Sequence, residues 1–253
     1  MGQVRLYVEQ ELGAGQTVRL AREQAHYLFG VMRLGPGDHL AVFDGRTGEW
    51  EAEVAEAGKR GGTLHVGERT RGPLPRPDLW LLFAPLKKAR TDFVVEKATE
   101  LGAARIVPVQ TEFTNAERVR RERLQAHAVE AAEQSGGTCV PEVADLVRLS
   151  DLLADWPAER RLMVCDEARA GGSSALPGGL ATDAPGETAR KGGRAGPWAI
   201  LIGPEGGFAP AERTRLAALP QACPVALGPR ILRADTAAVA ALTLWQAQLG
   251  DWR

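Results

Sequence analysis

The sequence is poor in the residues that bind metals or build disulfide frameworks. It has three cysteines in 253 residues, Cys139, Cys165 and Cys223, and four scattered histidines without metal-ligand spacing. An odd number of widely separated cysteines argues against a disulfide framework and against a cysteine-rich zinc site. We therefore expect no metal, and we interpret the cysteines as packed side chains in a reducing cytosol. A catalytic pair of Cys165 with a histidine is an alternative interpretation, but no motif supports it.

Long apolar runs are also missing. The run 198–202 is far shorter than the roughly 20 residues of a membrane-spanning helix. The apolar stretch near the C-terminus is interrupted by Asp235 and Gln246. The N-terminus lacks the basic and apolar segments of a secretory signal. These absences predict a cytoplasmic protein that does not enter a membrane.

Charge of one sign does not accumulate anywhere. Thirty-one Lys and Arg residues face 32 Asp and Glu residues, so the formal net charge is -1 at pH 7. Any contact with nucleic acid must therefore come from a local patch and not from a global field. The residues Arg118, Arg120, Arg121 and Arg123 form one such candidate patch, and an ordinary solvated helix face explains them equally well.

The common motifs of nucleotide-binding and hydrolytic enzymes are missing too. No G-x-G-x-x-G follows a strand in a βαβ unit, and there is no Walker A run or H-E-x-x-H motif. The G-x-S-x-G elbow is also absent. The sequence thus gives no support for a dinucleotide enzyme, a P-loop NTPase, a zinc protease or a serine hydrolase of the common types.

Two regions of different pattern divide the chain. Residues 1–72 show short strands separated by glycine turns, which predicts a small β-barrel-like domain. Residues 73–78 are rich in proline and are interpreted as a linker. In residues 79–253, apolar strands alternate with helices, which predicts an α/β domain with a mainly parallel sheet. The predicted strands are 5–8, 17–20, 39–43, 49–54, 63–66, 79–84, 105–109, 161–165, 198–203 and 224–228, and the predicted helices are 23–32, 92–101, 118–135, one from Pro210 and one from about Thr236.

One segment interrupts this alternation. Residues 171–196 are rich in Gly, Ala, Pro and Ser, a composition typical of a mobile surface loop. We interpret the segment as a tolerated insertion, and a lid over a site is the alternative interpretation.

Two glycine-containing runs carry the strongest functional signal. Residues 203–207 (GPEGG, the Gly203 loop) and residues 227–233 (LGPRILR, the Gly228 loop) each follow a predicted buried strand. Glycine lets the backbone approach a ligand closely, and such loops present N–H and C=O groups. The two loops are therefore expected to form two walls of one cleft. Arg233 stands between an apolar pair and a helix start, which favours a functional role for its charge.

Several segments of the chain, taken in order, resemble the RsmE-type ribosomal RNA small-subunit methyltransferases of the SPOUT superfamily. The segments 26–33, 36–38 and 43–45 resemble the PUA-like RNA-binding domain of that family. Lys87 with residues 97–102 (KATELG) resembles the first methyltransferase signature, and residues 130–135 (EAAEQS) with Val140-Pro141 resemble the second. The Gly203 loop and the Gly228 loop correspond to the third and fourth. The match covers essentially the whole chain, and four motifs in order are far more specific than any one.

The resemblance implies a concrete activity. The family transfers a methyl group from S-adenosylmethionine to N3 of a uridine in 16S rRNA of the small ribosomal subunit, and it works as a homodimer. The implied fold adds a C-terminal trefoil knot that holds the cofactor in a bent shape. The residues implied to bind the cofactor are Cys165, Leu201, Ile202, Gly203, Pro204, Glu205, Gly206, Leu227, Gly228, Ile231 and Leu232; those implied to bind RNA are Arg5, Arg33, Arg118, Arg120 and Arg121.

The chemistry expected of such an enzyme is mostly alignment. The sulfonium methyl is already activated, whereas the uridine N3–H must lose its proton. A nearby cation favours the N3 anion, and Arg233 or Lys87 is the hypothesised catalytic cation. Glu100 and Asp235 are chemically suitable as general bases, but no sequence feature selects either. The base must also leave its stack to reach the methyl group.

The chain departs from the family pattern at several positions. Phe113 and Gly137 stand where the family usually has arginine, which weakens the inferred RNA surface. Ala209 replaces a usual serine, a better helix cap, and residues 234–236 read Ala-Asp-Thr instead of Thr-Glu-Thr. These departures keep two alternatives open, a noncatalytic RNA-binding homologue and a SPOUT methyltransferase with a different RNA target.

Overall fold

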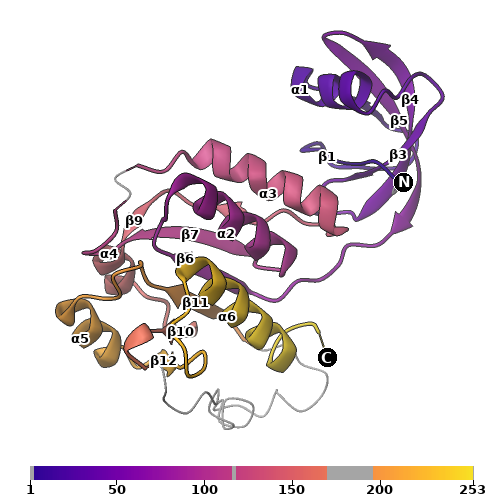
Figure 1. The fold of residues 1–253 in the computed structure, drawn as a ribbon. Helices are drawn as coiled ribbons and strands as arrows, with labels where there is room; N and C mark the ends of the chain where they lie inside the picture. The colour runs from indigo at the N-terminus through magenta and orange to yellow at the C-terminus, as the bar shows by residue number, and fades with distance from the viewer. Residues whose placement is uncertain (1–2, 116–117, 170–195, 253) are drawn as a thin grey trace. The chain divides into compact units, whose positions relative to one another are not determined.

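The computed structural model describes residues 3–115, 118–169 and 196–252 (Figure 1). Its packing divides the chain into two units. Unit 1 comprises Met1–Pro75 with Val129–Val140, and unit 2 comprises Arg76–Ala128 with Pro141–Arg253. The segment 129–140, which the sequence-based division places in the second domain, thus packs with the N-terminal residues.

Unit 1 is built on a five-stranded sheet in the order β1-β3-β4-β5-β2. Strands β1 and β3 are parallel and the other pairs are antiparallel. Side chains alternate along the strands, and the inward set, with Leu40 and Leu64 fully buried, forms one core together with Leu28 of the helical segment. This confirms the predicted small β domain. The strands are β1 (Arg5–Tyr7), β2 (Thr17–Arg19), β3 (His39–Phe43), β4 (Glu49–Gly58) and β5 (Gly61–Arg71).

The predicted helix 23–32 differs in form from the observed one. It begins as α1 (Arg22–Ala25) and continues as a π-helical segment, η1 (His26–Val31). The N–H of Met32 donates to the carbonyl of Tyr27, five residues back, at 2.9 Å. Arg33 then ends the segment with a φ of 60°. A 3.6-residue periodicity alone does not distinguish this wider turn from an α-helix.

Unit 2 contains a seven-stranded sheet in the order β12-β10-β11-β6-β7-β8, with β9 paired to β7, and every pair is parallel. The alternating strands and helices of the sequence confirm the α/β prediction. The strands are β6 (Leu79–Phe83), β7 (Arg105–Gln110), β8 (Glu142–Val143), β9 (Val147–Arg148), β10 (Arg161–Cys165), β11 (Trp198–Ile202) and β12 (Ala222–Val225); the helices are α2 (Lys88–Glu100), α3 (Arg121–Ser135), α4 (Leu149–Ala154), the 3-10 turn η2 (Glu167–Arg169), α5 (Pro210–Ala218) and α6 (Ala234–Gln248).

Helices cover both faces of this sheet, which explains why its central strands are apolar throughout. All five residues of β11 are buried. Leu201 and its neighbours on one face pack with Leu149 of α4 and Leu216 of α5. On the other face α6 packs against α2 and β11, and it buries Leu242 and Trp245 completely. Figure 1 shows α2 and α6 side by side. Full burial of such side chains contributes about 1.5–3 kcal/mol each.

Several element boundaries differ from the predictions. The predicted strand 224–228 is observed as β12, which ends at Val225 because its pairing with β10 places Val225 opposite Cys165. Helix α2 begins at Lys88 instead of residue 92, α3 at Arg121 instead of 118, and α6 at Ala234. Residues 171–195 of the predicted loop lie outside the described residues. The expected trefoil knot stays a prediction.

Candidate functional site

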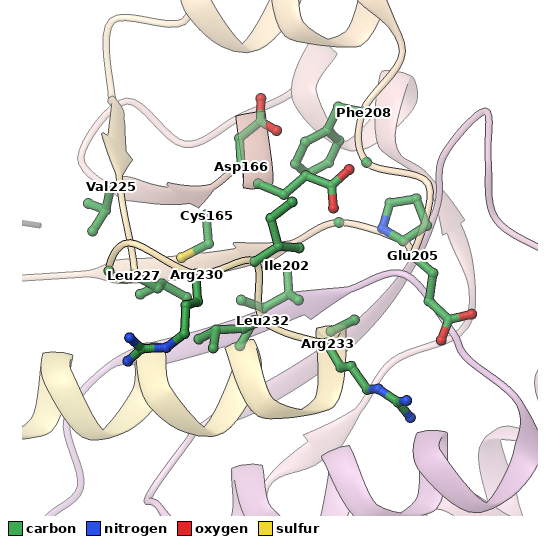
Figure 2. A pocket seen from close by; sticks show the side chains of 18 residues that line it. Cys165, Asp166, Ile202, Glu205, Phe208, Val225, Leu227, Arg230, Leu232 and Arg233 are labelled. Atoms are coloured by element: carbon green, nitrogen blue, oxygen red, sulfur yellow. The ribbon is translucent and has the colours of Figure 1, made fainter. Parts of the chain in front are cut away.

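A cavity of about 230 Å³ opens at the C-terminal ends of neighbouring parallel strands in unit 2 (Figure 2). The last residues of β10 and β11, Cys165 and Ile202, are paired in the sheet and form its floor. Ligands of parallel α/β sheets bind at this edge, because the loops that leave adjacent strands diverge there. The Gly203 loop and the Gly228 loop supply the walls, as the sequence predicts.

The Gly203 loop needs its glycines for steric reasons. Its turn is closed by the N–H of Gly207, which donates to the carbonyl of Pro204 at 2.9 Å, with Gly207 at a φ of 70°. A Cβ on Gly207 would lie 2.6 Å from Glu167 Oε1, and a Cβ on Gly203 would lie 3.0 Å from the ring of Phe208. A larger residue at either position would displace a wall of the cavity.

The Gly228 loop forms an apolar wall with charged residues along it. Gly228 has a φ of 110°, which reverses the chain between β12 and α6. Leu227 and Leu232 lie beside Ile202 in Figure 2, whereas the guanidinium groups of Arg230 and Arg233 extend in different directions. Ile231, which also lines the cavity, is 70% exposed. The cavity therefore combines apolar side chains with bare backbone, a composition typical of small-molecule sites.

The thiol of Cys165 faces the cavity but is chemically inert. Burial raises the pKa of Cys165 to about 12, so the thiol stays protonated near neutral pH. No histidine is among the described residues that line the cavity. The alternative of a catalytic Cys165–histidine pair therefore has no support in the geometry.

Arg90 organises the site, although no sequence motif assigns it a role. Its Nε donates to Asp235 Oδ2 at 2.8 Å, and its Nη1 donates to Glu205. The side chain thereby joins α2 to the Gly203 loop and to the first turn of α6. The sequence has no acidic residue three or four positions from Arg90, so Arg90 cannot form an ion pair at helix spacing. This absence is the one sequence feature that points to partners elsewhere in the chain.

The pairing with Arg90 affects the role of Asp235. Burial by itself would raise the pKa of Asp235, but hydrogen bonds from Arg90 and from the Thr236 N–H outweigh it and lower the pKa. A carboxylate with a lowered pKa is a weak base, so Asp235 fits a positioning role. Glu100, the other candidate base, bonds to Lys97 at 2.6 Å near the opposite end of α2, about 15 Å along the axis from Arg90.

The structure brings most of the predicted cofactor residues together. Leu201 and Gly206 are the exceptions among them: Leu201 points to the α4–α5 face of the sheet, as its position beside Ile202 dictates, and Gly206 lies against Phe113. Of the two predicted catalytic cations, Arg233 lines the cavity, whereas Lys87 is the exposed N-cap of α2 and does not. The lining residues that the prediction omitted are Asp166, Glu167, Gly207, Phe208, Val225, Arg230, Ala234 and Ala237.

The arginines predicted to bind RNA have different surroundings. Arg118 and Arg120 line a second cavity in unit 2, of about 540 Å³, with Lys88 and Arg123; we call it the basic groove. Arg121 donates through Nε to the carbonyl of Val143 at 2.9 Å. The groove is completed by Pro85, Leu86, Thr91, Asn115 and Val119.

Two further predicted RNA-binding arginines lie in unit 1. The side chain of Arg5 is only 13% exposed and donates to Glu49 and to the carbonyls of Ala132, Glu133 and Gly137 at 2.6–2.8 Å. Arg5 thus stabilises the C-terminal end of α3 and has no donor face turned to a ligand. Arg33 is exposed beside η1.

The described residues contain neither a candidate metal site nor a candidate membrane span. No group of three or more histidine, cysteine or acidic side chains is placed to hold a metal ion there. In the same ranges, no helix has the length and apolar character needed to span a bilayer.

Comparison with known proteins identifies the family. A family described as the RNA methyltransferase domain matches residues 73–246, and one described as the RNA methyltransferase PUA domain matches residues 20–66. Among curated proteins, the ribosomal RNA small subunit methyltransferase E of Mycobacterium tuberculosis is 30% identical over 97% of this chain and 94% of its own. The protein of the same name from Synechocystis is 32% identical over 97% of this chain and 78% of its own.

Solved structures give the same result. The ribosomal RNA small subunit methyltransferase E of Neisseria gonorrhoeae, bound to S-adenosyl methionine, aligns over the whole of both chains with a TM-score of 0.85 and 26% identity. A methyltransferase from Legionella pneumophila, in complex with the same cofactor, aligns over 99% of this chain and all of its own with the same score and identity. The chain therefore belongs to the RNA methyltransferase family, among the ribosomal RNA small subunit methyltransferases E.

Proposed function

We propose that this chain transfers the methyl group of S-adenosylmethionine to N3 of a uridine in 16S rRNA of the small ribosomal subunit, and that it does so in the cytoplasm as a homodimer. The observation that supports this most directly is the cavity at the ends of β10 and β11, where the Gly203 loop and the Gly228 loop meet. The name of the matching relatives and the cofactor in the matching structures agree with it.

The lining of the cavity fits an adenosyl group. Ile202, Leu227 and Leu232 supply apolar surface for a purine, and the glycine loops offer backbone donors and acceptors for its polar edge. When bound, S-adenosylmethionine supplies a methyl group that is already activated by the positive sulfur. The remaining tasks of the protein are to hold both reactants and to exclude water.

Arg233 is proposed to assist removal of the uridine proton. It lies at the N-cap of α6 and lines the cavity, and no carboxylate pairs with it in the described part of the chain. A cation there stabilises the N3 anion relative to the neutral imide and so lowers the barrier to attack. Lys87 is set aside as a catalytic group because it does not line the cavity.

Arg118 and Arg120 are proposed to hold the RNA backbone, with Lys88 and Arg123 beside them. These four side chains line one groove, and phosphates are the ligands that clustered guanidinium and ammonium groups bind. Nη1 of Arg123 already donates to Asp92 at 2.7 Å, so Arg118, Arg120 and Lys88 carry the proposal. Arg33 of the PUA-like unit is a further proposed contact. Arg5 is set aside because Glu49 and internal carbonyls occupy its donors. Arg121 stays a proposed contact, since it is exposed and its bond to the Val143 carbonyl uses Nε and not the Nη groups.

The proposal is tested by calorimetric titration with S-adenosylmethionine, followed by mass mapping of 16S rRNA from cells lacking the protein. We expect binding in the titration, one uridine that loses its methyl group, and restoration by the wild-type chain. Arg233→Ala is expected to lower the single-turnover rate about 100-fold or more, whereas Arg215→Ala, on the exposed side of α5, leaves it unchanged.

Each alternative has its own outcome in these experiments. Absence of S-adenosylmethionine binding would identify a noncatalytic RNA-binding homologue. A methyl group lost from a different RNA would identify a sister enzyme with another target. An undiminished rate in Arg233→Ala would reject the role given to Arg233.

A further inference from the structure

An aromatic side chain lies exposed beside the cavity wall. Phe113 follows β7 and is 46% exposed, although it is one of the few phenylalanines in the sequence. Large apolar side chains are normally withdrawn from water, since burial is worth roughly 25 cal/mol per Å². The exposure of the Phe113 ring is therefore explained if a ligand or a packing partner covers it.

The turn that carries Phe113 is firmly held. The hydroxyls of Thr111 and Thr114 are 2.8 Å apart, and the N–H of Thr111 donates to Thr114 Oγ1 at 2.9 Å. The N–H of Glu112 donates to Glu212 Oε1 at 2.9 Å, which ties the turn to α5. The ring is thus presented from a fixed backbone, and a fixed ring loses little entropy when it binds.

The ring adjoins the Gly203 loop. A Cβ on Gly206 would lie 3.4 Å from Cβ of Phe113 and 3.7 Å from two of its ring carbons, so the aromatic group rests against this glycine. The residues on either side of it, Glu205 and Gly207, line the cofactor cavity. Phe113 therefore lies against the same loop that forms one wall of the cavity.

The basic groove begins on the other side of the same segment. Asn115, two residues after Phe113, lines the groove together with Arg118 and Arg120. Helix α2 also contacts both places: Arg90 bonds to Glu205 at the cavity, and its neighbours Lys88 and Thr91 line the groove. Within unit 2, the segment 111–115 and helix α2 therefore each connect the cavity wall with the basic groove.

We propose that Phe113 is the stacking platform for the unstacked target base of the RNA whose phosphates lie in the basic groove. Single-stranded RNA is bound by this combination, cations along the backbone and an aromatic face for a base. The proposal rests on the proposed function and adds to it the residue that receives the base. It belongs to this chain in particular, because Phe113 replaces the arginine of the resembling family.

The test compares Phe113→Leu, which keeps an apolar cover over Gly206 but removes the aromatic face, with Phe113→Tyr, which keeps both. Each is titrated with a single-stranded RNA that carries the target uridine and with the same RNA made abasic at that position. Phe113→Leu is expected to weaken binding of the uridine RNA about 5- to 100-fold, while Phe113→Tyr binds as the wild type does. The abasic RNA is expected to bind equally to all three proteins.

The controls separate this proposal from the proposed function. S-adenosylmethionine affinity is expected to stay within about twofold of wild type in both variants, since Phe113 is not among the residues that line the cavity. If the wild type methylates the RNA and Phe113→Leu binds it equally well, stacking is refuted and the enzymatic function stands. If the leucine variant weakens uridine and abasic RNA equally, or sediments as a smaller assembly, Phe113 has a structural or subunit-contact role and the proposal fails. A wild type that binds neither RNA refutes both.

Discussion

Charged side chains around the cavity are held by specific partners. Arg213 donates to both oxygens of Asp166 at 2.8 and 3.0 Å, and hydrogen bonding to Asp166 raises the pKa of Arg213. Arg90 likewise donates to both oxygens of Asp235, at 2.8 and 3.4 Å, and this helps to lower the pKa of Asp235. These bonds connect loops that are far apart in sequence, so the site is rigid before any ligand binds. The sequence could not supply them, because long-range ion pairs leave no local pattern.

Cys165 allows a prediction about chemical reactivity. A thiol with the ordinary pKa of 9.0 is about one-tenth ionised at pH 8, whereas a pKa of about 12 leaves about one molecule in ten thousand as thiolate. We expect iodoacetamide to alkylate Cys165 about 10³-fold more slowly than a cysteine of ordinary pKa, with a rate that keeps rising up to about pH 12. Mass spectrometry of the alkylated peptides over a pH series measures this.

The partly exposed Cys139 and Cys223 are the internal references for that experiment. In denaturant all three thiols are expected to react alike, which shows that burial is the cause. Equal alkylation of all three in the folded protein would contradict the raised pKa.

The elements that form the site could be predicted from the sequence where a strand is a continuous apolar run or where a residue such as proline marks the start of a helix. The bounds of β10 follow from its apolar run, and α5 begins at Pro210, a favoured first position. Strand β12 was misplaced because its limits depend on pairing with β10. Leu201 is next to Ile202 in sequence, but side chains alternate between the two faces of a strand, so Leu201 points away from the cavity.

Helix α5 offers a direct test of the cap that the sequence lacks. Ala209, its N-cap, has no side chain to accept a backbone hydrogen bond, although Glu212 Oε2 accepts the Ala209 N–H at 2.9 Å. Ala209→Ser would complete a capping box, so the free energy of unfolding is expected to rise by about 1 kcal/mol. Denaturant unfolding measures the change.

Ala211→Ser is the matched control for the cap, because it places the same side chain in the exposed first turn of α5. There serine only lowers helix propensity, and the free energy of unfolding should fall by a few tenths of a kcal/mol. If both substitutions have the same sign and size, the cap explanation is wrong.

The whole molecule is almost neutral, with a formal net charge of -1. Long-range electrostatic attraction therefore contributes little to the binding of a polyanion. Affinity for RNA has to arise from local cations such as those of the basic groove. The sequence located Arg118 and Arg120 as a patch, but it could not show that Lys88 joins them, because α2 and the segment before α3 meet only in the folded chain.

The salt dependence of RNA binding tests this local character. Each phosphate contact in a single strand contributes roughly 0.7 to the slope of log K against log salt. Arg118→Gln combined with Arg120→Gln should therefore reduce the magnitude of the slope by about 1.4. Fluorescence anisotropy of a labelled single-stranded RNA over a salt series gives the slope. Arg215→Gln is the control, and an unchanged slope in the double variant would place the RNA elsewhere.

The division of helix α3 between the two units has a consequence for any attempt to separate them. The first half of α3 is counted with unit 2, whereas residues 129–140 pack with the N-terminal strands and accept hydrogen bonds from Arg5 and Arg71. A gene fragment that stops at residue 75 would encode the PUA-like strands without the backbone carbonyls that accept hydrogen bonds from these two guanidinium groups, although Glu49 would still pair with both. A single cut after residue 75 would thus deprive unit 1 of part of its own packing.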